Sequence, residues 1–320
     1  MKALVYWQEH HGRLFVMRET ILQTRQLGKR YGKRWAVKNL NLEVFRSDVF
    51  GFLGPNGAGK STTIRMILSL IKPTEGATEI FGHSLKSHRS EALRRVGGIV
   101  EKPDFYQYLS AYKNLEIVGA LSGDVKRKRI FEVLDLVGLS DRATDRVKTY
   151  SHGMKQRLGI AQALISDPEL IILDEPTNGL DPQGMKEVRD LIVHLSRDQK
   201  KTIILSSHLL NEIEMIANRM AIIHNGELVV QGDVNTLLDE GEKYVIVHAE
   251  PRQKVLSVLN RQKRILKNFS EKEGRFEVIM DFALIPELNK ALVGAGVHVR
   301  ALIPRRSLED LFLSMTERTT

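Results

Sequence analysis

Apolar and polar positions along the chain alternate between strand-like and helix-like periods. In residues 40–44 every second position is apolar, the period of a half-buried strand. Residues 49–53 form a short apolar run that leads directly into a glycine-rich segment. A helical spacing of apolar residues then covers 64–71, and Pro73 stops it. A strand that feeds a glycine loop and then a helix predicts the start of an α/β nucleotide-binding fold.

The same patterns continue toward the middle of the chain. Residues 109–166 are mostly helical in pattern, and the apolar runs 170–173 and 202–205 have the length of buried strands. In 222–230, an Asn-Gly pair separates two β-rich runs, which predicts a hairpin with a type I′ turn. We expect this first domain to close near Leu238.

After a polar stretch at 239–242 the rhythm changes, and residues 243–320 predict a small α+β domain. Ser307 is expected to cap its last helix, with an acidic residue in the first turn. The pattern gives strands at 244–248, 276–280 and 297–302, and helices at 254–259 and 286–292.

The beginning of the chain does not follow these patterns. Met17 stands just before the first organised strand pattern, at 21–27. We therefore expect residues 1–19 to be an N-terminal extension, in which 1–16 are a leader or precede the true start. A short additional strand is the alternative.

Composition limits the classes of protein to consider. A chain of 320 residues corresponds to about two domains. Its 42% hydrophobic and 27% charged residues exclude a disordered or collagen-like chain. The absence of cysteine excludes disulfides, thiolate metal sites and cysteine nucleophiles. No stretch approaches the roughly 20 apolar residues of a membrane span. The net charge of +9 suits nucleic acid, an anionic membrane or a phosphate ligand.

The glycine-rich segment has the spacing G-x-x-x-x-G-K-[ST] of a phosphate-binding loop. Glycines allow consecutive backbone N–H groups to point at a phosphate, and the following helix adds its positive N-terminal end. Lys60 is expected to reach the β- and γ-phosphates, and the Ser61 hydroxyl to hold Mg²⁺. The expected nucleotide-binding residues here are Gly54, Pro55, Asn56, Gly57, Ala58, Gly59, Lys60, Ser61 and Thr62.

Two carboxylates, Asp174 and Glu175, follow the apolar run 170–173. Unpaired carboxylates beside a buried strand are unfavourable, so a ligand would explain them. A bound Mg²⁺ would justify Asp174, and a polarised water would justify Glu175. The alternative is a strand end that simply emerges into solvent.

Upstream of this strand, the residues Tyr-Ser-His-Gly-Met-Lys-Gln-Arg at 150–157 precede a helical pattern. They resemble the signature loop, usually written LSGGQ, of the ATPase subunits of ATP-binding cassette (ABC) transporters. The resemblance covers about 20–238 and implies a P-loop NTPase ABC cassette with a helical subdomain at about 109–166. It also implies that Ser151 and Gly153 contact the nucleotide. The tail at 243–320 resembles an accessory domain found on some exporters.

Further positions match the family in order. Tyr31 resembles the aromatic residue that stacks on adenine, although an aromatic near a turn is often plain packing. Asp181 resembles the end of the D-loop, which crosses the dimer interface. His208, after the 202–205 run, resembles the switch histidine that hydrogen-bonds the γ-phosphate.

Two positions depart from the family pattern. Glu101 stands where most members have a glutamine, and its carboxylate is expected to ligate Mg²⁺ or hold water. The stretch 101–106 resembles antibiotic and lantibiotic exporters, in which this change is tolerated. In the signature loop, His152 replaces a glycine and Met154 replaces a glutamine, which predicts weaker or pH-sensitive closure.

The resemblance implies an ATP-hydrolysing motor subunit that binds ATP and Mg²⁺, with Lys60, Glu175 and His208 as catalytic residues. It would dimerise on ATP as a homodimer and power export through a separate transmembrane permease, at the cytoplasmic face of the membrane. A nucleic-acid- or ribosome-associated ABC-type ATPase is the alternative, although such proteins usually carry two cassettes or a coiled-coil insertion. A regulatory cassette without hydrolysis is disfavoured because the catalytic residues are all present.

Overall fold

A computed structural model describes the chain at residues 18–101, 103–123, 125–240, 243–272 and 274–306. The chain divides between Gly232 and Asp233 into two compact units, and each has its own apolar core. The sequence pattern placed this division a few residues later, between Leu238 and residue 243. Residues 1–17 of the expected N-terminal extension and the helix expected after Ser307 lie outside the described residues.

A largely parallel sheet forms the centre of the first unit. Within the described residues its strand order is β11-β10-β4-β9-β8-β7, and β10, β4, β9, β8 and β7 run parallel. β4, β8 and β9 are buried along their whole length, which explains why they are near-continuous apolar runs. The strands are β4 (Val49–Leu53), β7 (Val96–Ile99), β8 (Leu170–Leu173), β9 (Thr202–Ser207), β10 (Arg219–His224) and β11 (Glu227–Asp233).

The predicted hairpin turn lies between β10 and β11. Asn225 and Gly226 have φ values of 48° and 81°, and a type I′ turn requires a positive φ at both central residues. The prediction at this turn is confirmed.

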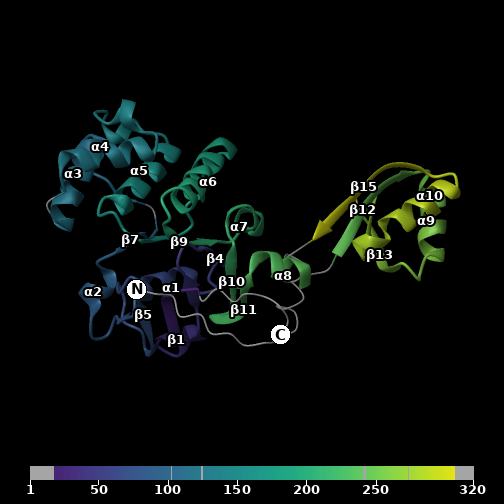
Figure 1. Ribbon diagram of the computed structural model, residues 1–320, viewed down its shortest axis with the longest axis horizontal. Coiled ribbons are helices and arrows are strands. Elements are labelled where there is room, and N and C mark those ends of the chain that lie inside the picture. Colours follow the sequence, from purple (N-terminus) through teal and green to yellow (C-terminus); the bar gives the residue numbers. More distant parts are fainter. Residues whose placement is uncertain (1–17, 102, 124, 241–242, 273, 307–320) are drawn as a thin grey trace. The chain divides into compact units, whose positions relative to one another are not determined.

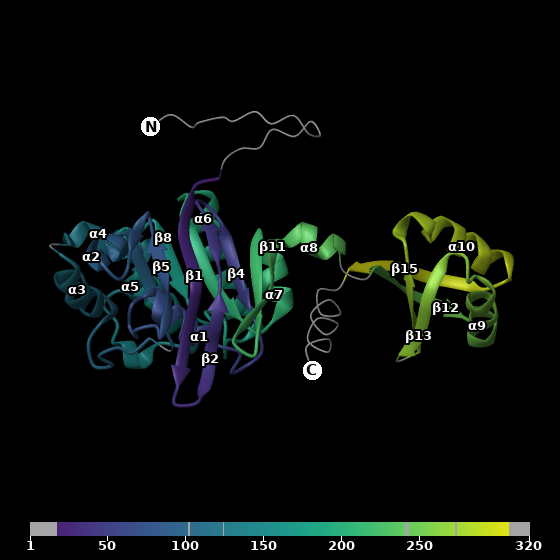
Figure 2. The same cartoon turned by 90° about the horizontal axis from the view of Figure 1, so that it is seen from below.

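An antiparallel sheet accompanies the parallel one. Its order is β2-β1-β5-β6, with β3 also paired to β1. Ile21 and Leu22 of β1 share one apolar core with Phe50 of β4 and Ile64 of the helix that follows β4. Figure 2 shows β1 and β2 running past that helix. The strands are β1 (Thr20–Tyr31), β2 (Arg34–Leu40), β3 (Glu43–Phe45), β5 (Glu75–Ile80) and β6 (His83–Ser84).

Three helices, α3, α4 and α5, pack on one another and form the helical subdomain that the sequence predicted (Figure 1). The helix after the glycine-rich loop is shorter than expected. It ends at Ile67 instead of continuing to Ile71, because Ser69 takes a left-handed φ of 55°. The helices of this unit are α1 (Lys60–Ile67), α2 (Arg89–Leu93), α3 (Ala111–Ser122), α4 (Arg127–Leu136), α5 (His152–Leu164), α6 (Pro182–Arg197) and α7 (Leu210–Ile216).

The second unit begins with α8 and continues as a βαββαβ arrangement. Its strand order, β13-β14-β12-β15, is that of a ferredoxin-like split βαβ fold. Alternate residues such as Val245, Val247, Phe276 and Val278 form its core with α9 and α10. β13 is absent from the sequence-based prediction. The elements are α8 (Val234–Glu240), β12 (Lys243–Glu250), α9 (Arg252–Arg261), β13 (Leu266–Lys272), β14 (Arg275–Met280), α10 (Ile285–Gly294) and β15 (His298–Arg306).

Candidate active site

The glycine-rich loop connects the buried strand β4 to helix α1. Gly59 has a φ of 111°, and a Cβ there would lie 2.6 Å from the carbonyl oxygen of Ala36. A side chain at this position is therefore excluded twice, by conformation and by space. α1 has no acidic residue in its first turn, so its N-terminal N–H groups suit an anion. The loop and the start of α1 line a pocket of about 160 Å³, to which Ala36 and Glu175 also contribute. The loop and helix residues that line it are Asn56, Gly57, Gly59, Lys60, Ser61 and Thr62.

Lys60 is the first residue of α1 and is only 5% exposed. Its Nζ donates to the carbonyl oxygens of Gly54 at 2.7 Å and Pro55 at 3.2 Å. It also forms an ion pair of 3.2 Å with Oε1 of Glu175. The loop thus turns two carbonyl oxygens inward to fix the ammonium group, and Ala58 is buried beneath it. This places one positive charge at the floor of a phosphate-sized pocket.

Asp174 and Glu175 follow β8 and are organised by the neighbouring strand β9. The hydroxyl of Ser206 donates to Oδ1 of Asp174 at 2.6 Å and accepts from the backbone N–H of Glu175 at 2.9 Å. Glu175 has a positive φ of 47°. A left-handed conformation is unfavourable for a residue with a side chain, and such strain is concentrated at functional sites.

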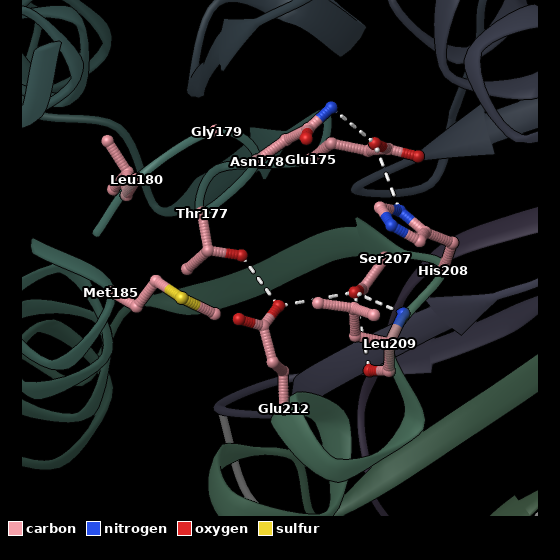
Figure 3. A pocket seen from close by; sticks show the side chains of 10 residues that line it. All are labelled: Glu175, Thr177, Asn178, Gly179, Leu180, Met185, Ser207, His208, Leu209 and Glu212. Carbon is pink, nitrogen blue, oxygen red and sulfur yellow. Dashed lines mark hydrogen bonds and ion pairs between the residues drawn. The ribbon is translucent and has the colours of Figure 1, made fainter. Parts of the chain in front are cut away.

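The carboxylate of Glu175 lies at the centre of the predicted catalytic group. Its Oε1 contacts Nζ of Lys60 at 3.2 Å, and its Oε2 lies 3.3 Å from Nδ1 of His208. Nδ2 of Asn178 donates to the same Oε2 at 3.0 Å (Figure 3). The structure therefore brings Lys60, Glu175 and His208 together, from three different parts of the chain.

A further pocket, of about 280 Å³, contains the residues expected to hold Mg²⁺. Ser61, Glu101 and Asp174 all line it. Within the described residues, no group of three or more His, Cys, Asp or Glu side chains is placed to hold a metal by itself. Mg²⁺ with a nucleotide is usually held by one or two protein groups and by phosphate oxygens, so the hydroxyl and carboxylate oxygens here fit it. The lining is completed by His152, Gln156, Glu175 and Asn178.

Glu101 differs from the other two expected metal ligands. Its carboxylate forms an ion pair with Arg65 of α1, and its side chain is 63% exposed. Its backbone φ is 65°, the same unusual region that Glu175 occupies. Glu101 therefore lies at the rim of the pocket, held by a cation from the helix that follows the phosphate loop.

Two expected nucleotide-binding positions in the signature loop lie outside the pockets that Glu175 lines. Ser151 is the N-cap of α5, where its hydroxyl accepts from the N–H of Met154 at 3.2 Å. Gly153 follows it in the first turn, and this turn also contains no acidic residue. The preceding Tyr150 donates to the carbonyl of Arg142 at 2.6 Å, and burial raises the pKa of Tyr150 to about 12. Hydrogen bonds of Ser151 and Tyr150 thus hold the start of α5 in place.

Tyr31 and Asp181 do not line the three pockets that Glu175 lines. Tyr31 ends β1 with its ring 52% exposed, and Nζ of Lys29 lies 5.3 Å from the ring centroid. Asp181 caps α6, where its Oδ1 accepts from the N–H of Gly184 at 3.0 Å. Neither side chain contacts Lys60, Glu175 or His208.

Several polar residues around Glu175 are missing from the sequence-based prediction. Ser206 and Asn178 contact Asp174 and Glu175 directly. The available signal was two serines at the end of an otherwise apolar strand, but nothing in the sequence shows which carboxylate they face. A pocket lined by Glu175, Asn178 and His208 also contains three further polar residues, Thr177, Ser207 and Glu212.

Comparison with known proteins identifies the family. The sequence profile of the ABC transporter family matches residues 37–178. A bacitracin transport ATP-binding protein, BcrA of Bacillus licheniformis, is 43% identical over 92% of this chain and 97% of its own length. The chain belongs to the ATP-binding proteins of ABC transporters. A lantibiotic transport ATP-binding protein, SrtF of Streptococcus pyogenes, is 42% identical over 66% of this chain and 90% of its own.

Solved ABC cassettes have the same architecture. The dimeric structure of the bacterial cassette MJ0796 matches with a TM-score of 0.61 at 26% identity, over 67% of this chain and 99% of that one. The same cassette has been solved in a post-hydrolysis state with ADP and phosphate. The predicted α/β ABC cassette is thus confirmed, and this ABC protein is an ATPase. In the part of the chain that the structure describes, no helix has both the length and the apolar character needed to cross a bilayer.

Proposed function

We propose that this ABC ATPase is the motor subunit of an antibiotic exporter, and that Lys60, Glu175 and His208 carry its hydrolytic step. The observation that supports this most directly is the placement of the Glu175 carboxylate between Lys60 and His208, at 3.2 and 3.3 Å. A carboxylate next to a phosphate-binding loop can orient or deprotonate the water that attacks the γ-phosphate.

ATP binding changes the partners of Lys60. In the structure, its ammonium group is paired with Glu175. The β- and γ-phosphates of ATP compete for the same ammonium group, because they carry more negative charge than one carboxylate. Glu175 is then released to accept a hydrogen bond from water, while His208 exchanges its contact with Glu175 for one with the γ-phosphate. Water attacks the γ-phosphorus, the bond to the β–γ bridging oxygen breaks, and the proton of the water passes to Glu175.

Mg²⁺ would be held by Ser61 and Asp174, with Glu101 at the rim of the same pocket. The ion would neutralise charge on the phosphates. Ser206 holds the Asp174 carboxylate in place through its 2.6 Å hydrogen bond.

A second copy of the chain completes each ATP site in this proposal. Ser151 and Gly153 belong to the capped start of α5, and neither lines the three pockets that Glu175 lines in the described part of the chain. A two-fold dimer would place them on the ATP of the other copy, where N–H groups can bind phosphate. Asp181 would lie at the same interface, and Tyr31 would stack on adenine. The related MJ0796 cassette, solved as a dimer, supports this arrangement.

A membrane-spanning permease would supply the path for the antibiotic, with this chain at the cytoplasmic face. Exposed aromatic residues lie where the permease would dock, near residues 101–112. The side chains of Tyr106 and Tyr108 are 53% and 67% exposed. Exposed apolar groups that gather on a surface mark interaction sites. The named relatives are transport proteins, so they favour a transporter over the nucleic-acid alternative.

Substitution of Glu175 tests the catalytic assignment. We expect Glu175→Gln to retain ATP binding but to lower phosphate release by about 10²-fold or more, because an amide cannot accept the proton. The variant should also accumulate an ATP-bound dimer, measured by size-exclusion chromatography. Glu79→Gln, on an exposed carboxylate of β5 paired with Arg25, is the matched control. Wild-type turnover in Glu175→Gln would contradict the assignment.

A further inference from the structure

Glu212 is a buried carboxylate that lies beside the proposed catalytic residues. It belongs to the first turn of α7 and is only 4% exposed. Its Oε2 accepts a hydrogen bond of 2.6 Å from the hydroxyl of Thr177 and one of 3.3 Å from the hydroxyl of Ser207. Figure 3 shows the carboxylate between these two side chains. Glu212 thus joins the segment that follows β8 to the end of β9, two parts of the chain that are separate in the sequence.

Each of these two parts of the chain adjoins one of two proposed catalytic residues, Glu175 and His208. These two are called the catalytic pair below. Thr177 follows Glu175 by two residues, and Ser207 directly precedes His208. The Ser207 hydroxyl also accepts from the N–H of Leu209 at 2.9 Å, which fixes the backbone on both sides of His208. The 3.3 Å contact between Glu175 and His208 is therefore the point at which the two parts of the chain held by Glu212 meet.

A purely structural role explains this carboxylate poorly. Both of its partners are neutral hydroxyl groups, and its Oε1 has no hydrogen-bond partner among the described residues. A buried charge without full compensation is unfavourable, and an apolar side chain would fill the same space at lower cost. Glu212 lines a pocket of about 160 Å³ together with Glu175 and His208. Because its two hydrogen bonds go to segments next to Glu175 and His208, its acceptor oxygen can position these two residues.

We propose that Glu212 is a positioning residue for ATP hydrolysis, which ties the loop after Glu175 to the loop that carries His208. Its acceptor oxygen holds Thr177 and Ser207 at a fixed separation, and this keeps the His208 ring within reach of the Glu175 carboxylate. The inference rests on the proposed function of that pair. Without Glu212, each loop can move separately, so ATP still binds but the catalytic pair is assembled less often.

Substitutions in the full-length chain test this role through steady-state ATP hydrolysis. Glu212→Ala removes the acceptor, and we expect kcat to fall about tenfold with KM for ATP changed less than about twofold. Glu212→Gln keeps an acceptor oxygen at the same place and should restore kcat to within about twofold of wild type. Thr177→Val removes one donor without changing the side-chain shape, and should lower kcat by about threefold to tenfold.

A second background separates positioning from general damage. If Glu212 acts through His208, then Glu212→Ala should lower the residual kcat of a His208→Ala variant by less than about twofold. Thr24→Val is the control, because Thr24 is a buried hydroxyl with two backbone hydrogen bonds in the antiparallel sheet. It should lower the melting temperature but leave kcat unchanged.

Several results would overturn the inference. These are an unchanged kcat in Glu212→Ala and Thr177→Val, a Glu212→Gln variant as slow as Glu212→Ala, or losses that multiply fully with His208→Ala. If Glu212→Ala does not fold, Thr177→Val and Glu212→Gln carry the test. Failure of the wild-type chain to hydrolyse ATP would instead contradict the proposed function, so the two failures are distinguishable.

Discussion

At the scale of single residues, two carboxylates of the site, Glu101 and Glu175, have a left-handed backbone conformation. Glu101 and Glu175 follow the ends of the neighbouring strands β7 and β8, and both have positive φ values, of 65° and 47°. Both residues line the pocket that Ser61 and Asp174 also line, with Glu101 at its rim. Such conformations persist only when the surrounding structure stabilises them. The fully buried strands β8 and β9 supply that support beside Glu175.

The departure from the family glutamine at Glu101 leads to a prediction. We expect Glu101→Gln to change the ATP hydrolysis rate by less than about twofold, because an amide oxygen can occupy the same rim position. Loss of the ion pair with Arg65 should lower stability by no more than about 1 kcal/mol, since both side chains are more than a third exposed. Phosphate release and urea unfolding measure the two effects.

Asp174→Asn is the comparison variant for Glu101→Gln. Asp174 is buried and bonded to Ser206, so its substitution should abolish turnover. A loss of more than about tenfold in Glu101→Gln would instead show that the charge at the rim is essential.

The sequence predicted candidate residues that the structure brings together where a fixed local spacing carries the chemistry. Lys60 and Ser61 follow from the loop motif, and Glu175 from its place after a buried strand. It did not predict Asn178 or Glu212, because their roles depend on contacts between segments far apart in the chain. Thr177 and Glu212 are 35 residues apart, and no local pattern relates them.

At the scale of secondary structure elements, β7 and the signature-loop helix α5 approach each other closely. A Cβ on Gly97 of β7 would lie 2.0 Å from the backbone carbonyl of Ala163 in α5. This approach was invisible in the sequence, and the glycine pair at Gly97 and Gly98 weakened the strand pattern of β7. β13 was missed for a related reason, because most of its residues are polar and exposed.

Gly97→Ala tests this contact. A methyl group there must push apart two backbone segments, so we expect a loss of about 1–3 kcal/mol in the free energy of unfolding. Gly98→Ala is the milder comparison, because Gly98 is exposed and its Cβ would lie 3.0 Å from the movable end of the Leu68 side chain and 3.3 Å from the carbonyl oxygen of Ile172. Urea unfolding of both variants measures the difference. Equal stabilities would mean that α5 shifts freely on β7.

At the scale of the whole molecule, the candidate site belongs to one of two units, each with its own apolar core. The core of the first unit includes β4, β8 and α1, which position the phosphate loop and the carboxylates. The core of the second unit lies within 245–302 and contains none of the candidate site residues.

The net charge of +9, from 48 Lys and Arg against 39 Asp and Glu, suits phosphate handling and an anionic membrane surface.

Separate cores predict separate responses to nucleotide. In calorimetry of the intact Glu175→Gln chain, we expect two unfolding transitions, because multidomain chains depart from two-state behaviour. ATP and Mg²⁺ at about 100 times Kd should stabilise the first unit by about 2.7 kcal/mol and raise its transition by roughly 5–10 °C. The transition of the second unit should stay unchanged. Lys60→Ala, which loses a phosphate contact, should weaken or remove the shift. One transition that ATP moves as a whole would show that the two cores unfold as one.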